Sequence, residues 1–163
     1  MFRVSCIQLK SNNNIQYNLK KTEKLIIKAV KQQTDFILTP EVSSMFSLNK
    51  KNLLKISTSM QNDIYLNGIK NLAKKYGKWI LIGSLIIRIK KNKLVNRSVL
   101  VSDKGKIKSY YDKIHMYDVI LSKKEKYFES NTFTPGKSIK SFKLPWGKLG
   151  LSICYDLRFP NLY

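Results

Sequence analysis

The order of the apolar patterns near the N-terminus restricts the possible folds more than any other feature of the chain. The segment FRVSCIQL alternates loosely between apolar and polar residues and stops at SNNN, which is typical of a strand. A second buried strand, Phe36–Leu38, precedes Thr39-Pro40. Between the two, residues at steps of four, three, four and three predict one face of a helix that ends near Gln33: Ile15, Leu19, Thr22, Ile26 and Ala29. This order of strand, helix and strand favours a parallel pair with a right-handed crossover.

The rest of the chain predicts one clear further helix and several strands joined by turns. The helix runs from about Asp63 to Tyr76, with Gly77 placed to cap it, whereas residues 42–60 fit either a short helix or a loop. Strands are expected at 79–83, 94–102, 107–111 and 149–153, with 85–89 as a continuation or partner of the first. Turns between the middle strands indicate antiparallel neighbours. We therefore expect an α/β fold in a single domain, because no repeat or linker divides residues 1–163.

The formal net charge of +21 raises the question of a nucleic-acid partner. The basic residues are spread along the chain, only four of them are arginine, and no helix-turn-helix, zinc-finger or RNP-type signature is present. Lysine and asparagine are abundant in stretches such as SNNN, LNKKN and KKNK, which indicates a solvated surface shaped by biased composition. We expect no specific nucleic acid, and a basic nucleic-acid-binding module is kept as an alternative function.

Cysteine content and hydropathy limit the compartment and the kind of site. Two cysteines, Cys6 and Cys154, cannot build a disulfide framework, which argues against a small secreted protein. No apolar run approaches the roughly 20 residues that span a bilayer, and MFRVSCIQLK is too polar for a signal peptide. We expect a cytoplasmic protein without a membrane partner. His115 is the only histidine, and the cysteines are not paired in sequence, which argues against a zinc site.

Three reactive side chains each follow one of the predicted strands: Glu41, Lys113 and Cys154. In α/β proteins ligands gather at the carboxyl ends of strands, so these side chains can converge. A thiol attacks as the thiolate, and a carboxylate can take its proton and return it to a leaving amine. A lysine beside them can orient the carboxylate and stabilise an oxyanion. Together they suit acyl transfer from an amide, with thioester formation, ammonia release and hydrolysis.

Each of these residues also has a structural interpretation. Cys154 at the end of a buried strand can be inert packing, Glu41 can cap a helix, and Lys113 is one of many lysines. A Cys–His dyad with His115 is conceivable, but the IHMY context favours a structural hydrogen-bonding role for that histidine.

Three stretches of the chain carry a family resemblance, in the expected order. TPEVSS contains Glu41, YYDKIHMYDV contains Lys113, and LGLSICYDLRFPNLY contains Cys154. They resemble the motifs around the catalytic glutamate, lysine and cysteine of the carbon–nitrogen hydrolase (nitrilase) superfamily, specifically its Nit-type amidases. The opening VSCIQLKSNNNIQYNLKKTEKLI is similar to the first strand and helix of that family. The resemblance implies that Glu41 is the general base, Lys113 the oxyanion-stabilising lysine and Cys154 the nucleophile.

The resemblance extends to three supporting residues. Glu129, in YFESNTFTPG, matches a second glutamate that helps to position the family's site; otherwise it is a surface carboxylate. Arg158 resembles an arginine that contacts a substrate carboxylate in acid-recognising members, and its alternative role is a structural salt bridge, for example to Asp156. Tyr155 would contribute its backbone N–H to the oxyanion.

The family also implies a fold, an assembly and a substrate class. Its members form a four-layer α-β-β-α sandwich, are usually homo-oligomers, and use no cofactor or metal. The CYDLRFP and KIHMYDV strings are nearest to a subgroup that contains ω-amidases and deaminated-glutathione amidases. We therefore expect hydrolysis of the amide of a small carboxylate-bearing substrate through a cysteine thioester.

The chain departs from the family in two places. Asn161 stands where the family keeps a glutamate, and the sequence stops at Tyr163, nine residues after Cys154. The resemblance therefore predicts the N-terminal part of the sandwich, a domain of residues 1–163 that is incomplete at its C-terminus. The alternative functions are a catalytically incomplete fragment or a partner-binding subunit, with a second polypeptide supplying the missing half.

Overall fold

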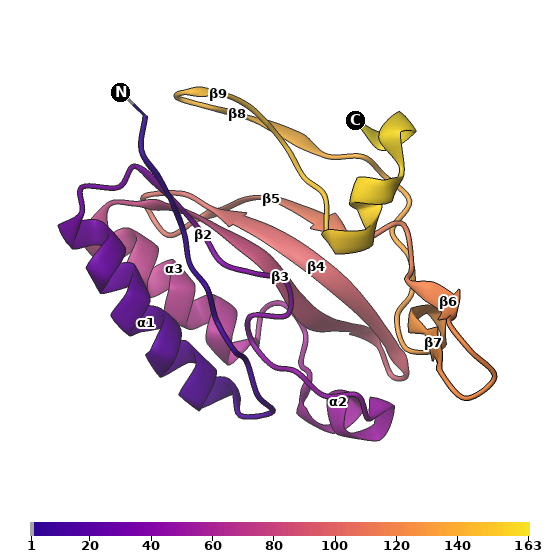
Figure 1. Ribbon diagram of the computed structural model, residues 1–163. Helices are drawn as coiled ribbons and strands as arrows, with labels where there is room; N and C mark the ends of the chain where they lie inside the picture. The colour runs from indigo at the N-terminus through magenta and orange to yellow at the C-terminus, as the bar shows by residue number, and fades with distance from the viewer. Residues whose placement is uncertain (1) are drawn as a thin grey trace.

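The computed structural model describes residues 2–163 and contains a five-stranded sheet with two long helices on one face (Figure 1). The strands lie in the order β1 (Val4–Cys6), β2 (Phe36–Leu38), β3 (Trp79–Lys90), β4 (Lys93–Val101) and β5 (Ile107–Asp112). The first three are parallel, and the last three are antiparallel neighbours. The predicted parallel pair and the predicted antiparallel middle part are both confirmed.

The helices begin and end where side chains satisfy their free backbone groups. Helix α1 (Ile15–Lys31) starts at Asn14, whose side chain accepts a hydrogen bond from the Tyr17 N–H. Helix α3 (Ile64–Tyr76) starts at Asp63 in the same way and ends at Gly77, whose φ of 60° is the left-handed conformation that suits glycine. The undecided stretch 42–60 contains a short helix, α2 (Lys50–Ile56), which is capped by Asn49.

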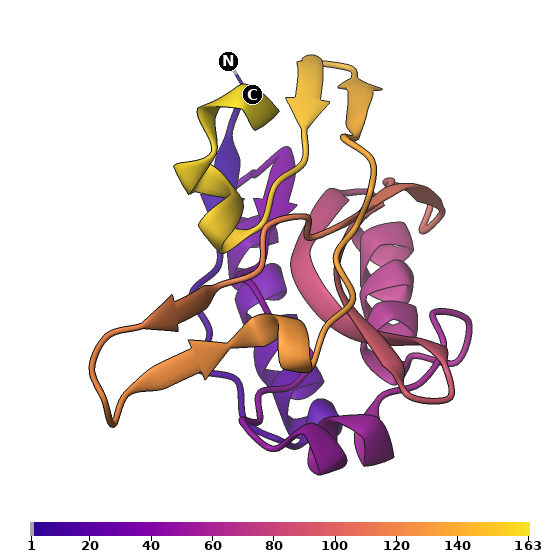
Figure 2. The same ribbon diagram turned by 90° about the vertical axis from the view of Figure 1, so that its right-hand side faces the viewer.

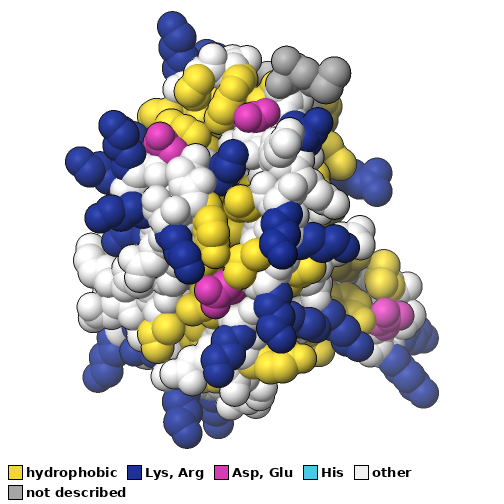
Figure 3. Space-filling model, turned by 90° about the vertical axis from the view of Figure 1, so that its left-hand side faces the viewer, with side chains coloured by type: hydrophobic (Ala, Val, Ile, Leu, Met, Phe, Trp, Pro, Cys, Tyr) yellow, Lys and Arg dark blue, Asp and Glu magenta, His cyan; other side chains and the backbone are white. Residues whose placement is uncertain are grey.

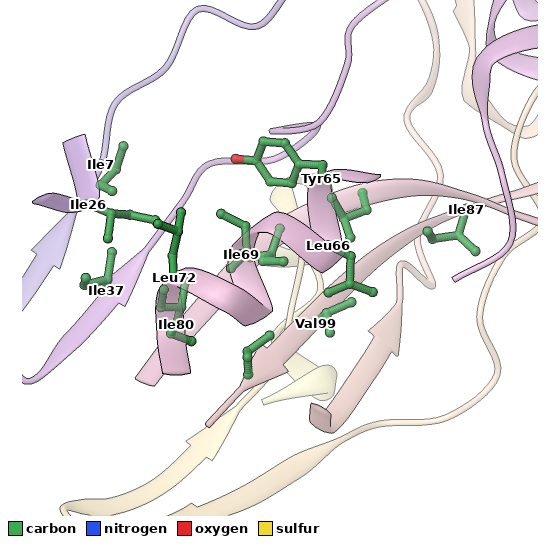
Figure 4. Packing of buried hydrophobic residues seen from close by; sticks show 14 of the residues in the cluster. Ile7, Ile26, Ile37, Tyr65, Leu66, Ile69, Leu72, Ile80, Ile87 and Val99 are labelled. Atoms are coloured by element: carbon green, nitrogen blue, oxygen red, sulfur yellow. The ribbon is translucent and has the colours of Figure 1, made fainter. Parts of the chain in front are cut away.

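The sheet buries apolar side chains on both faces, because successive strand residues point to opposite sides. Ile80 and Ile82 of β3 pack with helices α1 and α3 in the larger cluster, in which Leu66 and Ile69 of α3 lie over the strands (Figure 4). Leu81, between them in sequence, belongs to a second cluster. That second cluster combines Phe36, Leu100 and Tyr111 of the sheet with Leu144, Leu151 and Ile153 from the C-terminal part.

Two predictions about strands need revision. Residues 85–89 continue β3 with a shift in the register between Ile82 and Leu85, so the continuation is confirmed and the partner strand is not. The strand predicted at Leu149–Ile153 is wrong: β9 (Gly147–Gly150) ends earlier and pairs with β8 (Ser141–Leu144) in a separate hairpin. Leu151 and Ile153 are buried against the second face of the sheet. The alternation of apolar and polar residues in this segment therefore reflects packing on the sheet rather than pairing with another strand.

The C-terminal part adds short elements beside the sheet. The hairpin of β6 (Asp118–Ile120) and β7 (Lys126–Phe128) projects from the body of the molecule (Figure 2). A 3₁₀ turn, Glu129–Asn131, follows β7, and two others, Cys154–Arg158 and Pro160–Leu162, lie at the end of the chain. The α/β class is confirmed, and the described residues supply a helix layer on one face of a five-stranded sheet.

The surface is basic without a single continuous field on the face seen in Figure 3. There Lys and Arg side chains alternate with apolar, uncharged and acidic ones. Among residues 2–163, no helix is both long and apolar enough to cross a bilayer.

The packing of α3 generates a stability prediction. Ile69 is fully buried and Ile64, on the same helix, is 50% exposed. Truncating Ile69 to alanine opens a cavity in the larger cluster, so Ile69→Ala should lower the free energy of unfolding by about 2–5 kcal/mol. Ile64→Ala should change it by less than about 1 kcal/mol. Urea denaturation followed by circular dichroism measures both, and equal losses would contradict this account of the core.

Candidate active site

Glu41 lies just after β2 in a tight, strained connection. The following residue, Val42, has a φ of 46°, which is unusual for a β-branched side chain, and its N–H donates to the Ser84 hydroxyl at 2.7 Å. A Cβ added to Gly83 would lie 2.2 Å from the Thr39 carbonyl oxygen, so only glycine allows β3 to approach here. Strain of this kind persists where neighbouring contacts hold a functional side chain in place.

Lys113 follows β5 and is almost completely buried, with 2% of its surface exposed. Its Nζ donates to both oxygens of Glu129, at 2.8 and 3.0 Å, and lies 3.4 Å from Oε1 of Glu41. Its backbone N–H donates to the Asn96 carbonyl at 2.9 Å. A buried ammonium needs such partners, because an unpaired charge away from water is very costly.

Cys154 opens the 3₁₀ turn Cys154–Arg158 and has a φ of 47°. This strained turn is held by Asp156, whose carboxylate is fully buried. The Asp156 oxygens accept hydrogen bonds from the Ile153 N–H at 2.9 Å, the Tyr111 hydroxyl at 2.7 Å and the His115 N–H at 3.0 Å. Asp156 therefore ties the cysteine turn to the segment that follows β5.

His115 takes part in the same network through its side chain. Its Nδ1 lies 2.7 Å from Oδ1 of Asp156, and its ring stacks on Phe159 with the centroids 3.6 Å apart. The structure thus gives His115 the hydrogen-bonding role that its sequence context favoured. It does not line the cavity beside Cys154.

Glu41, Lys113, Glu129 and Cys154 line one cavity of about 520 Å³, although they come from four separate parts of the chain. Much of the remaining wall is apolar, with contributions from α2, β3 and the β6–β7 hairpin: Phe46, Leu48, Leu53, Ile86, Phe128 and Phe133. The sequence interpretation required a carboxylate, an amine and a thiol to lie close together, and in the structure all three line the same cavity. A small molecule can reach all of these groups at once.

The pKa values in the cavity favour a charged lysine and an uncharged thiol. Burial alone would lower the pKa of Lys113, but the hydrogen-bonded Glu129 and the nearby Glu41 raise it above its ordinary value. Partial loss of solvent raises the pKa of the Cys154 thiol, and Glu41 raises it further through its charge and a hydrogen bond; Lys113 opposes this rise. A nucleophilic attack by Cys154 therefore needs a base to remove its proton.

Tyr155 and Arg158 are not among the residues that line the cavity, and the role predicted for Tyr155 concerns its backbone N–H, directly after Cys154, rather than its ring. The Tyr155 ring makes edge contacts with Tyr117 and Phe159, at 5.1 and 5.4 Å between centroids. Arg158 is exposed. The ion pair between Arg158 and Asp156 that the sequence allowed does not form among the described residues, because Tyr111, His115 and the Ile153 N–H surround that carboxylate.

Asn96 of β4 is a site residue that the sequence did not single out. Its Nδ2 donates to Oε1 of Glu41 at 2.7 Å, and its backbone carbonyl receives the Lys113 N–H. The only signal in the sequence was a polar residue inside a predicted strand, and its burial is known only from the structure. Within residues 2–163, no group of three or more His, Cys, Asp or Glu side chains is arranged to hold a metal ion.

Comparison with known proteins places the chain in a family. A sequence profile described as carbon-nitrogen hydrolase matches residues 3–163. The chain belongs to the carbon–nitrogen hydrolase family. The deaminated glutathione amidase of Yersinia enterocolitica is 34% identical over 163 residues, which cover 98% of this chain and 56% of that protein. The omega-amidase of Saccharomyces cerevisiae is 30% identical over 98% of this chain and 57% of its own length. The chain spans little more than half the length of these curated relatives.

Solved structures agree with this assignment at the level of the fold. The NitFhit protein of C. elegans matches with a TM-score of 0.86 and 27% identity, over 99% of this chain and 41% of that one. An amidase from Nesterenkonia sp. matches with a TM-score of 0.84 and 21% identity, over 99% of this chain and 58% of that one.

The Asp156 network of this carbon–nitrogen hydrolase predicts a dependence of stability on pH. Burial alone would raise the pKa of Asp156, but the hydrogen bonds from Tyr111, Ile153 and His115 outweigh it and hold the pKa below the ordinary 3.8. The stabilisation is therefore complete above pH 3.8 and is lost as the pH falls through the folded-state value. At pH 7, Asp156→Asn should lower the free energy of unfolding by about 1–3 kcal/mol.

The difference between wild type and Asp156→Asn should shrink as the pH drops below 3.8, since the protonated wild type then resembles the variant. Denaturation midpoints measured from pH 7 to pH 2.5 provide the comparison. A difference that stays constant over this range would show that the charge of Asp156 contributes nothing.

The electrostatics around Cys154 give a second pH prediction. Because Glu41 raises the pKa of the thiol, Glu41→Gln should shift alkylation of Cys154 by iodoacetamide to lower pH. Labelling rates from pH 6 to pH 10, read by peptide mass spectrometry, measure the shift, and Cys6 in the same sample is the internal control. An upward shift for Cys154, or an equal shift at both cysteines, would contradict this role of Glu41.

Proposed function

We propose that the protein hydrolyses the amide of a small carboxylate-bearing molecule and releases ammonia and a carboxylic acid. The observation that carries the proposal is the single cavity in which Glu41, Lys113 and Cys154 meet. Relatives named deaminated glutathione amidase and omega-amidase support the choice of an amide substrate. The activity is proposed for the protein that contains this chain, since the chain spans only part of those relatives.

The proposed reaction begins with Cys154. Glu41 takes the thiol proton as Sγ attacks the amide carbon, and the carbonyl oxygen becomes a negatively charged oxyanion. The Lys113 ammonium stabilises this oxyanion, together with the backbone N–H of Tyr155. Glu41 then gives its proton to the nitrogen as the C–N bond breaks, ammonia leaves, and a thioester remains on Cys154.

Hydrolysis of the thioester completes the cycle. Glu41 removes a proton from a water molecule, and the resulting hydroxide attacks the thioester carbon. The C–S bond then breaks to release the acid, and Glu41 returns the proton to Sγ, which restores the thiol and the carboxylate. Glu129 and Asn96 take no proton in this scheme. They hold Lys113 and Glu41 in place through the contacts at 2.8 and 2.7 Å.

The proposed oligomeric assembly is the one that the family resemblance implies. We propose that residues 1–163 are one carbon–nitrogen hydrolase domain and that the working protein is a homo-oligomer, or an oligomer completed by a second polypeptide. Strands β1 and β5 are the outer strands of the sheet within the described residues, and such edges pair readily with further strands. Light scattering coupled to size exclusion measures the assembly.

The decisive experiment measures ammonia release from succinamate, an amide with a carboxylate at its other end. Cys154→Ala should lower the rate by on the order of 10³-fold or more, because the nucleophile is lost. Cys6→Ala is the matched control and should retain the wild-type rate, since Cys6 lies in β1 outside the cavity. Intact-mass spectrometry during turnover should detect an acyl group on the wild type that Cys154→Ala lacks. Turnover that survives Cys154→Ala refutes the proposed mechanism.

A further inference from the structure

The charged residues that line the active-site cavity differ in whether they have partners. Glu41, Glu129 and Lys113 hold one another through the contacts at 2.8 to 3.4 Å. Lys126 also lines the cavity, but it makes no ion pair among residues 2–163. Lys126 is therefore the one basic residue of the cavity wall, within the described part of the chain, that makes no ion pair.

The β6–β7 hairpin carries Lys126 at a defined position beside the site. In the register of the hairpin Lys126 lies opposite Ile120, and all three residues of β7, Lys126 to Phe128, line the cavity. The base of the hairpin is joined to the site, because the Tyr117 N–H donates to Oε2 of Glu129 at 2.7 Å. The β6–β7 hairpin, which projects from the body of the molecule (Figure 2), is therefore attached at its base to Glu129.

The proposed substrate has a negatively charged end that needs a partner. Arg158, which the sequence suggested for this task, is exposed and does not line the cavity. Lys113 is neutralised by two carboxylates, and much of the remaining wall is apolar. A carboxylate that enters such a cavity loses water and binds favourably only where a cation faces it.

We propose that Lys126 binds the substrate carboxylate and so selects ω-amides of acids over neutral amides. The inference rests on the proposed function and adds the residue that recognises the charged end. The amide then lies at Cys154 and Lys113, while the carboxylate lies farther out, under the β6–β7 hairpin. The substrate class is an amide with an anionic group at its opposite end.

Alkylation of Cys154 tests the charge of the cavity without any turnover. Iodoacetate and iodoacetamide are similar in size, but only iodoacetate is anionic. The ratio of their labelling rates at Cys154, divided by the same ratio at Cys6, cancels differences in thiolate content and reagent reactivity. Lys126→Gln should lower this normalised ratio about threefold to tenfold, because a nearby cation is lost. Lys126→Arg keeps the charge and should keep the ratio.

Lys124→Gln is the matched control, since Lys124 lies in the loop that joins β6 to β7, carries the same charge and does not line the cavity. It should leave the ratio within about 1.5-fold of wild type, as expected for a screened surface charge. An unchanged ratio in Lys126→Gln, or an equal fall in Lys124→Gln, overturns the proposal. Equal falls would mean that the general positive field of the protein attracts the reagent.

The second measurement compares the hydrolysis of a negatively charged amide with that of a neutral amide. Lys126→Gln should lower kcat/KM for succinamate about threefold to tenfold, with Lys126→Arg restoring it, and should leave kcat/KM for neutral butyramide unchanged. An equal loss for both amides contradicts recognition of the carboxylate by Lys126. If the wild type hydrolyses neither amide, the proposed function fails, and the alkylation ratio still decides whether Lys126 attracts anions to the cavity.

Discussion

The buried ammonium of Lys113 is the constraint on which the rest of the site depends. A lysine with 2% of its surface exposed needs negative partners, and Glu41 and Glu129 provide them. One partner lies after β2 and the other after β7, so satisfying one cation draws distant segments of the chain together. The same two carboxylates keep the lysine charged and raise the pKa of Cys154. Folding and the proposed chemistry thus use the same charges.

Much of the fold could be predicted because local patterns determine it. The helical face from Ile15 to Ala29 and the cap at Gly77 follow from side-chain spacing and from the freedom of glycine at positive φ. The strand expected at Leu149–Ile153 was wrong because buried apolar residues alternate both in a paired strand and in an extended segment that only packs on a sheet. Pairing is a long-range property, and no local pattern reports it.

The candidate site could be predicted only in part for the same reason. Glu41, Lys113 and Cys154 were found because reactive residues after strands are informative, and the motifs around them resembled a known family. Asn96 and Asp156 were missed as members of the site because their importance lies in what they contact across the fold. Arg158 was proposed because it resembles an arginine that contacts a substrate carboxylate in the family, yet it lies exposed at the end of the 3₁₀ turn. Lys126 had no distinguishing signal among the many lysines of the sequence.

Asn96 of β4 contacts both the proposed general base and the segment that carries the proposed oxyanion-stabilising lysine. Its side chain holds the carboxylate of Glu41, and its backbone holds the segment that carries Lys113. A small shift of that strand therefore carries the acid and the amine in the same direction and preserves the spacing between them. The spacing of the acid and the amine is in this way tied to one residue of the sheet rather than to the two loops that carry them.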